Sequence, residues 1–275
     1  MKTRIISALV GTVLLLAVLF CPWIWVFGLV VAAAAAVATY ELLHNTGIVK
    51  EKWMLWGSVV FATVQSMGIA LSMTVMAFGF LWLLVVYTMF TLVMFLLRRN
   101  SSVWKGYGLA LYASVGFGSL GFLRITWGAL DPNAGLDAGL VFVLLPMVIA
   151  WMSDTGAYFT GVFFGKHKMA PVISPKKTWE GFFGGWIISI GMTVLYGVIC
   201  NAILGETFEL WMLAILAAVL APLSVVGDLL ASWVKRRTGI KDYGNIMPGH
   251  GGVMDRFDSV MFIAPMVLPA LLLFW

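Results

Sequence analysis

The chain has 275 residues, of which 62% are hydrophobic and only 11% are charged, and its formal net charge is +5. A soluble domain of this length cannot hide so much apolar surface, so the composition excludes a soluble protein and indicates lipid as the solvent for most of the chain. The two cysteines, Cys21 and Cys200, have neither a CxxC spacing nor a histidine nearby, which excludes a cysteine-ligated metal site.

Nine apolar segments follow one another, each long enough to cross a bilayer when tilt is allowed. Their approximate bounds are 5–21, 23–43, 54–72, 75–97, 106–123, 138–164, 181–200, 209–233 and 259–275. The first resembles a signal peptide, but Pro22 joins it directly to the second, which favours a retained hairpin of two spans. We therefore expect an all-α, polytopic integral membrane protein with about nine transmembrane helices. Residues 1–123 would supply N-terminal membrane helices, and residues 124–275 the catalytic region of one continuous membrane domain.

The basic residues set the expected orientation of these spans. With the N-terminus in the cytoplasm, 16 of the 17 Lys and Arg residues fall in inner loops, and Arg124 alone falls outside. Shifting the count by one helix destroys this split, so the positive-inside rule favours a cytoplasmic N-terminus. The same rule accounts for the basic net charge, so no nucleic-acid partner is expected. The two longest inner segments, 165–180 and 234–258, would then face the cytoplasm, where nucleotides are found.

Two aspartates fall inside apolar segments. Asp154 lies in the run WMSDTGAYFTG of the sixth segment, and Asp228 lies in the run VVGDLLAS of the eighth. A carboxylate at membrane depth is costly unless it is paired, binds a cation or faces water. Small neighbours leave room for an ion or a ligand at both residues, which favours a functional role. The alternative is a protonated or lysine-paired residue that serves helix packing.

The stretch 224–258 concentrates the charge of an otherwise apolar chain. Its acids are Asp228, Asp242, Asp255 and Asp258, and its basic residues are Lys235, Arg236, Arg237, Lys241 and Arg256. Carboxylates that can hold a divalent cation, next to Lys and Arg that can hold phosphates, are what phosphoryl or nucleotidyl transfer requires. On a helix Asp255 and Asp258 would share one face and converge on a cation, although a capping pair at a helix start is an equal alternative. The glycines around His250 would let backbone N–H groups approach an anion.

The other long inner segment, 165–180, reads GKHKMAPVISPKKTWE. Its four lysines and two prolines predict a constrained cationic loop. Taken alone, such lysines are topology signals, but beside the stretch 224–258 on one membrane face they would form a phosphate clamp. Glu41 and His44, in the second segment, are expected to be interfacial residues without a catalytic role.

The polar run from Ser232 to Asp258 resembles the signature of the phosphatidate cytidylyltransferases, also called CDP-diacylglycerol synthases. In this chain it reads S-x-V-K-R-x4-K-D-x-G, followed by P-G-H-G-G-x-x-D-R-x-D. The runs SDTGAY at Ser153–Tyr158 and SPKKTWEG at Ser174–Gly181 are also similar to sequences of that family. The N-terminal half agrees only in being hydrophobic helices, so no functional residue is expected there.

The resemblance implies a Mg²⁺-dependent reaction of CTP with phosphatidate that gives CDP-diacylglycerol and diphosphate. The attacking lipid phosphate is already an anion, so the obstacle is repulsion between two polyanions, which metal ions and Lys or Arg relieve. The expected metal ligands, for Mg²⁺ with or without a second cation, are Asp228, Asp255, Asp258 and Asp154. The expected catalytic residues are Asp228, Lys235, Arg236, Lys241, Asp242, Asp255 and Arg256. The expected substrate-binding residues are Ser174, Lys176, Lys177, Ser232, Pro248, His250, Gly251 and Gly252.

These expectations describe a site among the sixth, eighth and ninth segments, facing the cytoplasm from the bacterial inner (plasma) membrane. Its partners would be CTP, phosphatidate and the lipid bilayer, and small-residue helix faces such as Gly181 with Gly185 would also suit a homodimer. Two rival functions stay open. One is a related lipid kinase or cytidylyl enzyme that acts on a polyprenol or an ether lipid, with Asp154 as base for a hydroxyl acceptor. The other is a secondary transporter with Asp154 and Asp228 as ion sites, which expects internal repeats that the sequence lacks.

Overall fold

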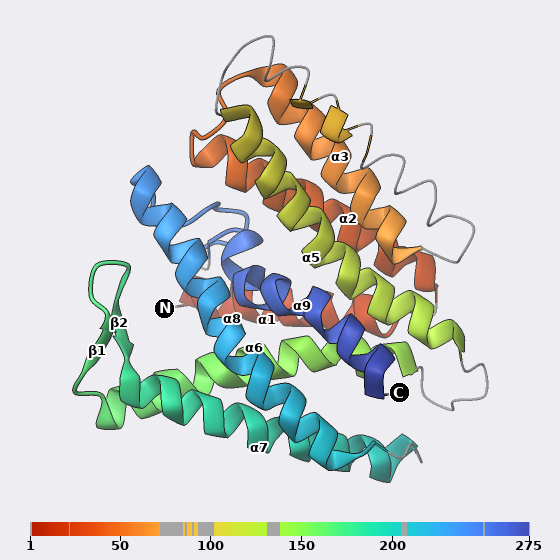
Figure 1. Ribbon diagram of the computed structural model, residues 1–275, viewed down its shortest axis with the longest axis vertical. Coiled ribbons are helices and arrows are strands. Elements are labelled where there is room, and N and C mark those ends of the chain that lie inside the picture. Colours follow the sequence, from red (N-terminus) through yellow and green to blue (C-terminus); the bar gives the residue numbers. More distant parts are fainter. Residues whose placement is uncertain are drawn as a thin grey trace. The chain divides into compact units, whose positions relative to one another are not determined.

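The computed structural model is helical along most of the chain (Figure 1). It describes residues 2–21, 23–71, 85, 87–89, 91–92, 102–130, 138–204, 208–249 and 251–274. The elements are α1 (Lys2–Leu19), α2 (Ile24–Tyr40), the π-helical turn η1 (Glu41–Asn45), α3 (Lys52–Ala70), α5 (Ser102–Leu130), α6 (Ala138–Phe164), β1 (Lys168–Ala170), β2 (Ser174–Thr178), α7 (Trp179–Leu204), α8 (Leu210–Thr238) and α9 (Met254–Phe274). The expected all-α, polytopic class is confirmed.

Six of the described helices are long and apolar enough to cross a membrane. They cover Trp25–Asn45, Lys52–Ala70, Ser102–Ile125, Gly139–Phe164, Trp179–Ile203 and Leu210–Thr238. Prolines interrupt α6, α8 and α9, which membrane helices tolerate because neighbouring helices satisfy the freed backbone groups. Most of the expected segment 75–97 lies outside the described residues. The count of nine spans and the cytoplasmic N-terminus stay predictions.

The chain forms two compact units. The first comprises Met1–Leu130 and Val234–Phe257, and the second comprises Asp131–Trp233 and Asp258–Trp275. Helices α8 and α9 therefore each contribute residues to both units. The expected division into residues 1–123 and 124–275 stays a prediction.

In the first unit, α2, α3 and α5 pack against one another. Glycines of α5 allow the close approach, because a Cβ atom on Gly118 would lie 2.8 Å from the Cβ atom of Ile69 on α3. Membrane helices associate through such close contacts, since lipid gives them no hydrophobic reason to pair.

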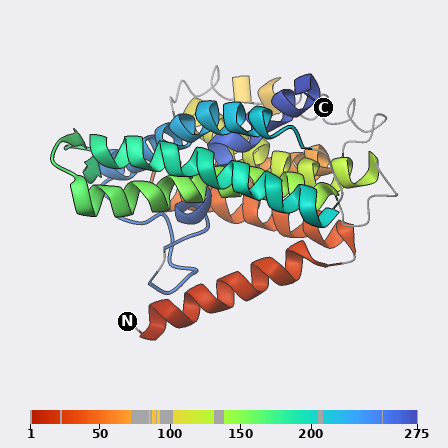
Figure 2. The same ribbon diagram turned by 90° about the horizontal axis from the view of Figure 1, so that it is seen from below.

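In the second unit, α6 and α7 run side by side, as both views show (Figure 1 and Figure 2). A Cβ atom on Gly156 would lie 3.0 Å from the Cα atom of Gly185, and one on Gly161 would lie 3.7 Å from the Cα atom of Gly181. These small-residue faces therefore pack within the chain and give no argument for a homodimer.

A two-stranded antiparallel hairpin, β1 with β2, connects α6 to α7 and extends from their common end (Figure 1). Lys168 lies opposite Thr178, and Ala170 lies opposite Ser174. The sequence predicted a constrained cationic loop here but not its strands. At the base of the hairpin, Glu180 accepts the backbone N–H groups of Lys166 at 3.1 Å and of His167 at 3.2 Å. The lysines of this segment are thus held on a defined backbone.

The C-terminus of α8 has a Schellman motif. The Ile240 N–H donates to the carbonyl of Lys235 at 3.1 Å, and the Gly239 N–H donates to the carbonyl of Arg236 at 3.4 Å. Gly239 takes φ = +74°, the left-handed conformation that this motif needs and that glycine adopts without strain. The basic residues of the last turn also suit the negative end of the helix dipole.

Candidate active site

The second unit brings the two membrane-depth aspartates and one lysine together. Lys177, on β2, forms an ion pair with Asp228, on α8, and the two side chains are 21% and 23% exposed. Asp154, on α6, interacts electrostatically with both of them. Asp228 is therefore paired with a lysine, and the functional role expected for it stays a prediction. Because the pair is partly shielded from water, its electrostatic interaction is stronger than that of a fully exposed pair.

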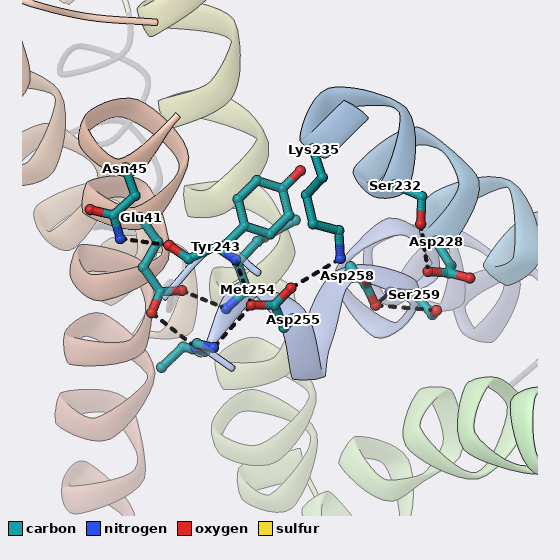
Figure 3. Close-up of polar contacts among 12 residues, drawn as sticks. Glu41, Asn45, Asp228, Ser232, Lys235, Tyr243, Met254, Asp255, Asp258 and Ser259 are labelled. Atoms are coloured by element: carbon teal, nitrogen blue, oxygen red, sulfur yellow. Dashed lines mark hydrogen bonds and ion pairs between the residues drawn. The ribbon is translucent and has the colours of Figure 1, made fainter. Parts of the chain in front are cut away.

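Two serines hold the aspartates of this unit. The Ser232 hydroxyl donates to Asp228 at 3.5 Å, one helical turn away on α8 (Figure 3). The Ser259 hydroxyl donates to Asp154 at 3.3 Å, and the Ser259 N–H donates to the carboxylate of Asp258 at 2.8 Å. Ser259 thereby connects α6 to α9 and links two of the four carboxylates expected to hold a metal.

Gly227 lets α8 and α9 approach at the level of these acids. A Cβ atom there would lie 2.6 Å from the Cβ atom of Phe262 and 3.1 Å from the carbonyl oxygen of Asp258. Any larger residue would push α8 away from α9. The glycine that precedes Asp228 thus has a packing reason.

A cavity of about 520 Å³ opens at these charges. Its polar lining includes Asp154, Lys168, Ser174, Lys176, Lys177 and Asp228. Its apolar lining comes largely from α6, α7 and α8 and includes Tyr158, Val162, Phe182 and Val225. Five residues expected from sequence therefore line one cavity: Asp154, Asp228, Ser174, Lys176 and Lys177. Lys168 also lines it; the sequence placed that residue among the four lysines of the expected phosphate clamp but not among the expected substrate-binding residues.

Thr178 positions β2 against the start of α7. Its hydroxyl accepts the N–H of Gly181 at 3.1 Å, which satisfies one of the unpaired donors of the first helical turn. Thr178 is 5% exposed and follows Lys177 directly. The cap therefore fixes the backbone that carries the paired lysine.

In the first unit, Asp255 organises the end of the polar loop that precedes α9. One of its oxygens pairs with Lys235 at 3.0 Å (Figure 3). The other accepts the N–H groups of Tyr243 at 2.7 Å and of Gly252 at 2.9 Å. Lys235 also lies over the Tyr243 ring, 5.2 Å from its centroid. The expected role of Asp255 in metal binding stays a prediction, but its oxygens already serve three donors.

The glycines of this loop have conformational and packing reasons. Gly249 and Gly251 take φ values of +79° and +88°, and Met247 pairs with Gly251 across the turn, where the Met247 N–H donates at 3.0 Å. A Cβ atom on Gly251 would lie 2.7 Å from the carboxylate of Asp255. Whether the turn also binds an anion stays a prediction, and His250 lies outside the described residues.

The remaining candidates from this stretch are at the surface. The exposed residues are Arg236, Lys241, Asp242, Pro248 and Arg256. Phosphate binding by the Lys and Arg residues among them stays a prediction.

Sequence reasoning expected Glu41 to be an interfacial residue and did not predict its contacts or those of Asn45. Glu41 is 2% exposed, and its carboxylate accepts the N–H groups of Val253 and Met254. The only available signal was a glutamate near the end of an apolar segment. Its partners are more than 200 residues away in sequence, so no local pattern could reveal them.

The carboxylate oxygens of the second unit are ligands of the kind that Mg²⁺ prefers. No group of three or more His, Cys, Asp or Glu side chains among the described residues is arranged to hold a metal ion. Mg²⁺ usually keeps several waters, however, and binds through one or two carboxylates plus substrate phosphates. Asp154 and Asp228 offer hard oxygen donors of that kind. The ammonium of Lys177 beside them indicates that this position stabilises positive charge.

The chain is similar to individual known proteins over about half of its length and to a family model over nearly all of it. Phosphatidate cytidylyltransferases of Staphylococcus epidermidis (strain RP62A) and Staphylococcus aureus (strain COL) are 46% and 45% identical to it over 129 and 131 residues. That of Staphylococcus haemolyticus is 44% identical over 131 residues. In each case the alignment covers 47% of this chain and 48% of the relative, so the chain spans about half the length of the curated relatives it matches. The model of the cytidylyltransferase family matches residues 2–274, and the chain therefore belongs to this family.

Proposed function

We propose that the protein is a phosphatidate cytidylyltransferase, which converts CTP and phosphatidate to CDP-diacylglycerol and diphosphate. The observation that carries the proposal is the cavity in which Asp154 and Asp228 face Lys177, with further lysines and an apolar wall around them. A lipid phosphate needs a cationic site beside an apolar one. The names of the staphylococcal relatives support the same substrate.

The reaction needs no strong base. A phosphate oxygen of phosphatidate attacks the α-phosphorus of CTP in line, the bond to the β-phosphate bridging oxygen breaks, and diphosphate leaves with the electron pair. The attacking oxygen is an anion at neutral pH, so the residues must mainly neutralise and orient phosphates. A bound Mg²⁺ would supply charge neutralisation for the triphosphate, and Asp228 and Asp154 would hold it.

Lys177 is the residue most directly suited to the lipid or nucleotide phosphate. Its buried ammonium is ion-paired with Asp228. An ammonium has three donors, so it can keep this ion pair and still donate to a phosphate oxygen. Lys168 and Lys176 line the same cavity and would add positive charge.

The charged end of α8 would contribute to nucleotide binding. Lys235, Arg236, Lys241 and Arg256 are proposed to neutralise the triphosphate, while Ser232 supports Asp228. We further propose that the site faces the cytoplasm from the inner (plasma) membrane, because the positive-inside rule places the basic segments on that side.

Transfer from labelled CTP by the detergent-purified protein, with phosphatidate and Mg²⁺, tests the function. Wild type should form CDP-diacylglycerol, and Asp228→Asn should lower kcat about 100-fold or more, because a charged group at the reacting phosphates is lost. Glu209→Gln, an exposed acid-to-amide change before α8, serves as the control and should keep wild-type activity. Transfer to a polyprenol instead of phosphatidate would move the assignment to a lipid kinase-like enzyme. Inactivity of the wild type on every lipid acceptor would contradict the proposal and favour a transporter.

A further inference from the structure

Glu41 is a buried carboxylate that the proposed reaction does not use. It is the first residue of η1, at the end of α2, and it is 2% exposed. Its two oxygens accept the N–H groups of Val253 at 3.1 Å and of Met254 at 2.9 Å (Figure 3). Both N–H groups belong to the start of α9, where donors have no partner within the helix and the helix dipole is positive. A single negative side chain therefore satisfies two backbone N–H donors at the beginning of α9.

The same π-helical turn also holds the other end of the polar loop. Asn45, four residues after Glu41, donates its amide N–H to the carbonyl of Tyr243 at 2.5 Å. π-Helical turns are rare and occur often at functional sites. Residues 243–254 are thus fastened to one turn of the N-terminal helices at both of their ends.

Two loop glycines fit against the Glu41 carboxylate. A Cβ atom on either Gly244 or Gly252 would overlap Oε1 of Glu41, so both positions need glycine for the contact to form. Gly252 also donates its N–H to Asp255 at 2.9 Å, and Asp255 pairs with Lys235 at 3.0 Å. A shift of the Glu41 carboxylate is therefore transmitted through two contacts to a lysine of the charged stretch.

We infer that Glu41 is a positioning residue for the proposed cytidylyl transfer: it fixes the loop 243–254, and with it the cations expected to bind the nucleotide. The inference rests on the proposed function. Glu41 touches backbone and not substrate, so its removal should act on nucleotide binding through the loop conformation. A purely structural cap would instead lower stability and leave the kinetic constants of the folded enzyme unchanged.

Glu41→Gln is the first variant. An amide has one acceptor oxygen, so its NH₂ group would face one of the two backbone N–H groups as a second donor. Loss of an acceptor for a charge-assisted hydrogen bond predicts an increase in KM for CTP of about 10-fold or more, with KM for phosphatidate little changed. Glu51→Gln is the matched control, since Glu51 lies in the same unit and its carboxylate accepts the indole N–H of Trp53, two residues away in sequence.

Trypsin cleavage after Lys241 supplies a readout that does not depend on activity. The loop should be cut faster in Glu41→Gln than in wild type or Glu51→Gln, because one of its two anchors is weakened. Gly252→Ala disrupts the same contact from the loop side, and it replaces Glu41→Gln as the test variant if Glu41→Gln does not fold. The double variant should be no worse than the more affected single variant, because both changes disrupt one contact.

The outcomes separate this inference from the proposed function. If wild type makes no CDP-diacylglycerol, the function fails, whereas the cleavage rates still test whether Glu41 anchors the loop. If wild type is active and Glu41→Gln keeps its KM for CTP and its cleavage rate, Glu41 is not a positioning residue. An equal rise in both KM values, or additive effects in the double variant, would also overturn the inference.

Discussion

Lys177→Met tests whether Asp228 and its surroundings form a cation site. The substitution removes the ammonium and keeps an unbranched chain, so Asp154 and Asp228 lose the charge that now balances them. The two carboxylates should then repel each other. A divalent cation that binds there no longer has to compete with the lysine, so Mg²⁺ should bind more tightly.

The magnitude follows from the exposure of the pair. Lys177 and Asp228 are 21% and 23% exposed, which places the pair between the surface and the interior. Breaking a buried pair costs roughly 3–5 kcal/mol and a surface pair contributes roughly 0–1 kcal/mol, so about 2 kcal/mol is expected here. Converted to an equilibrium constant, this is about a 30-fold lower Mg²⁺ concentration at half-saturation.

Thermal unfolding of the detergent-purified protein during a Mg²⁺ titration measures this shift, because a ligand that binds the folded state raises Tm by mass action. Lys166→Met is the control, since Lys166 is exposed in the same segment and is not among the residues that line the cavity. A parallel NaCl titration at equal ionic strength corrects for screening. Transfer activity should fall in Lys177→Met although Mg²⁺ binds better. A midpoint that stays at the wild-type value or moves to higher Mg²⁺ would refute the reasoning.

Two further predictions concern the frame around the cavity. Thr178→Val should remove the cap of α7 and lower the unfolding free energy by about 1 kcal/mol, seen as a lower Tm that added Mg²⁺ does not abolish; an unchanged Tm would show that the cap is replaced. Gly185→Leu should destabilise the α6–α7 packing by about 3 kcal/mol or more, because its Cβ atom would overlap the Ser153 carbonyl oxygen. Gly185→Leu should therefore change the elution profile of the detergent-solubilised protein. Gly191→Leu is the control, because a Cβ atom there meets nothing within 4 Å, and it should leave the profile unchanged. Equal elution profiles of the two variants would contradict the packing argument.

The helices were predictable because each is a long apolar run, and lipid demands that such a run satisfy its own backbone hydrogen bonds. The hairpin was not. β1 and β2 have three and five residues, and their lysines and proline give no alternation of apolar and polar positions. Its strands are held by pairing between Lys168 and Thr178, which no local pattern specifies.

The candidate residues were easier to find than their partners. Asp154, Asp228 and Lys177 were recognisable because charge is rare in this chain and each lies in an unusual local setting. That Lys177 pairs with Asp228 depends on how the hairpin meets α8, which is a tertiary fact. The partners of Glu41 were missed for the same reason, since it bonds the backbone of residues 253 and 254 across most of the chain.

The partners of the carboxylates distinguish two kinds of acid. Glu41 and Asp255 accept backbone N–H groups, so withdrawing either would leave buried donors unsatisfied and alter the loop before α9. Asp154 and Asp228 instead each accept from a serine hydroxyl, and both interact with the ammonium of a lysine side chain. Side-chain partners can rotate away when a cation or phosphate arrives, at little cost to the fold. Of the four expected metal ligands, Asp228 and Asp154 are therefore better placed to exchange partners during a reaction cycle, whereas Asp255 is better placed to hold the loop still.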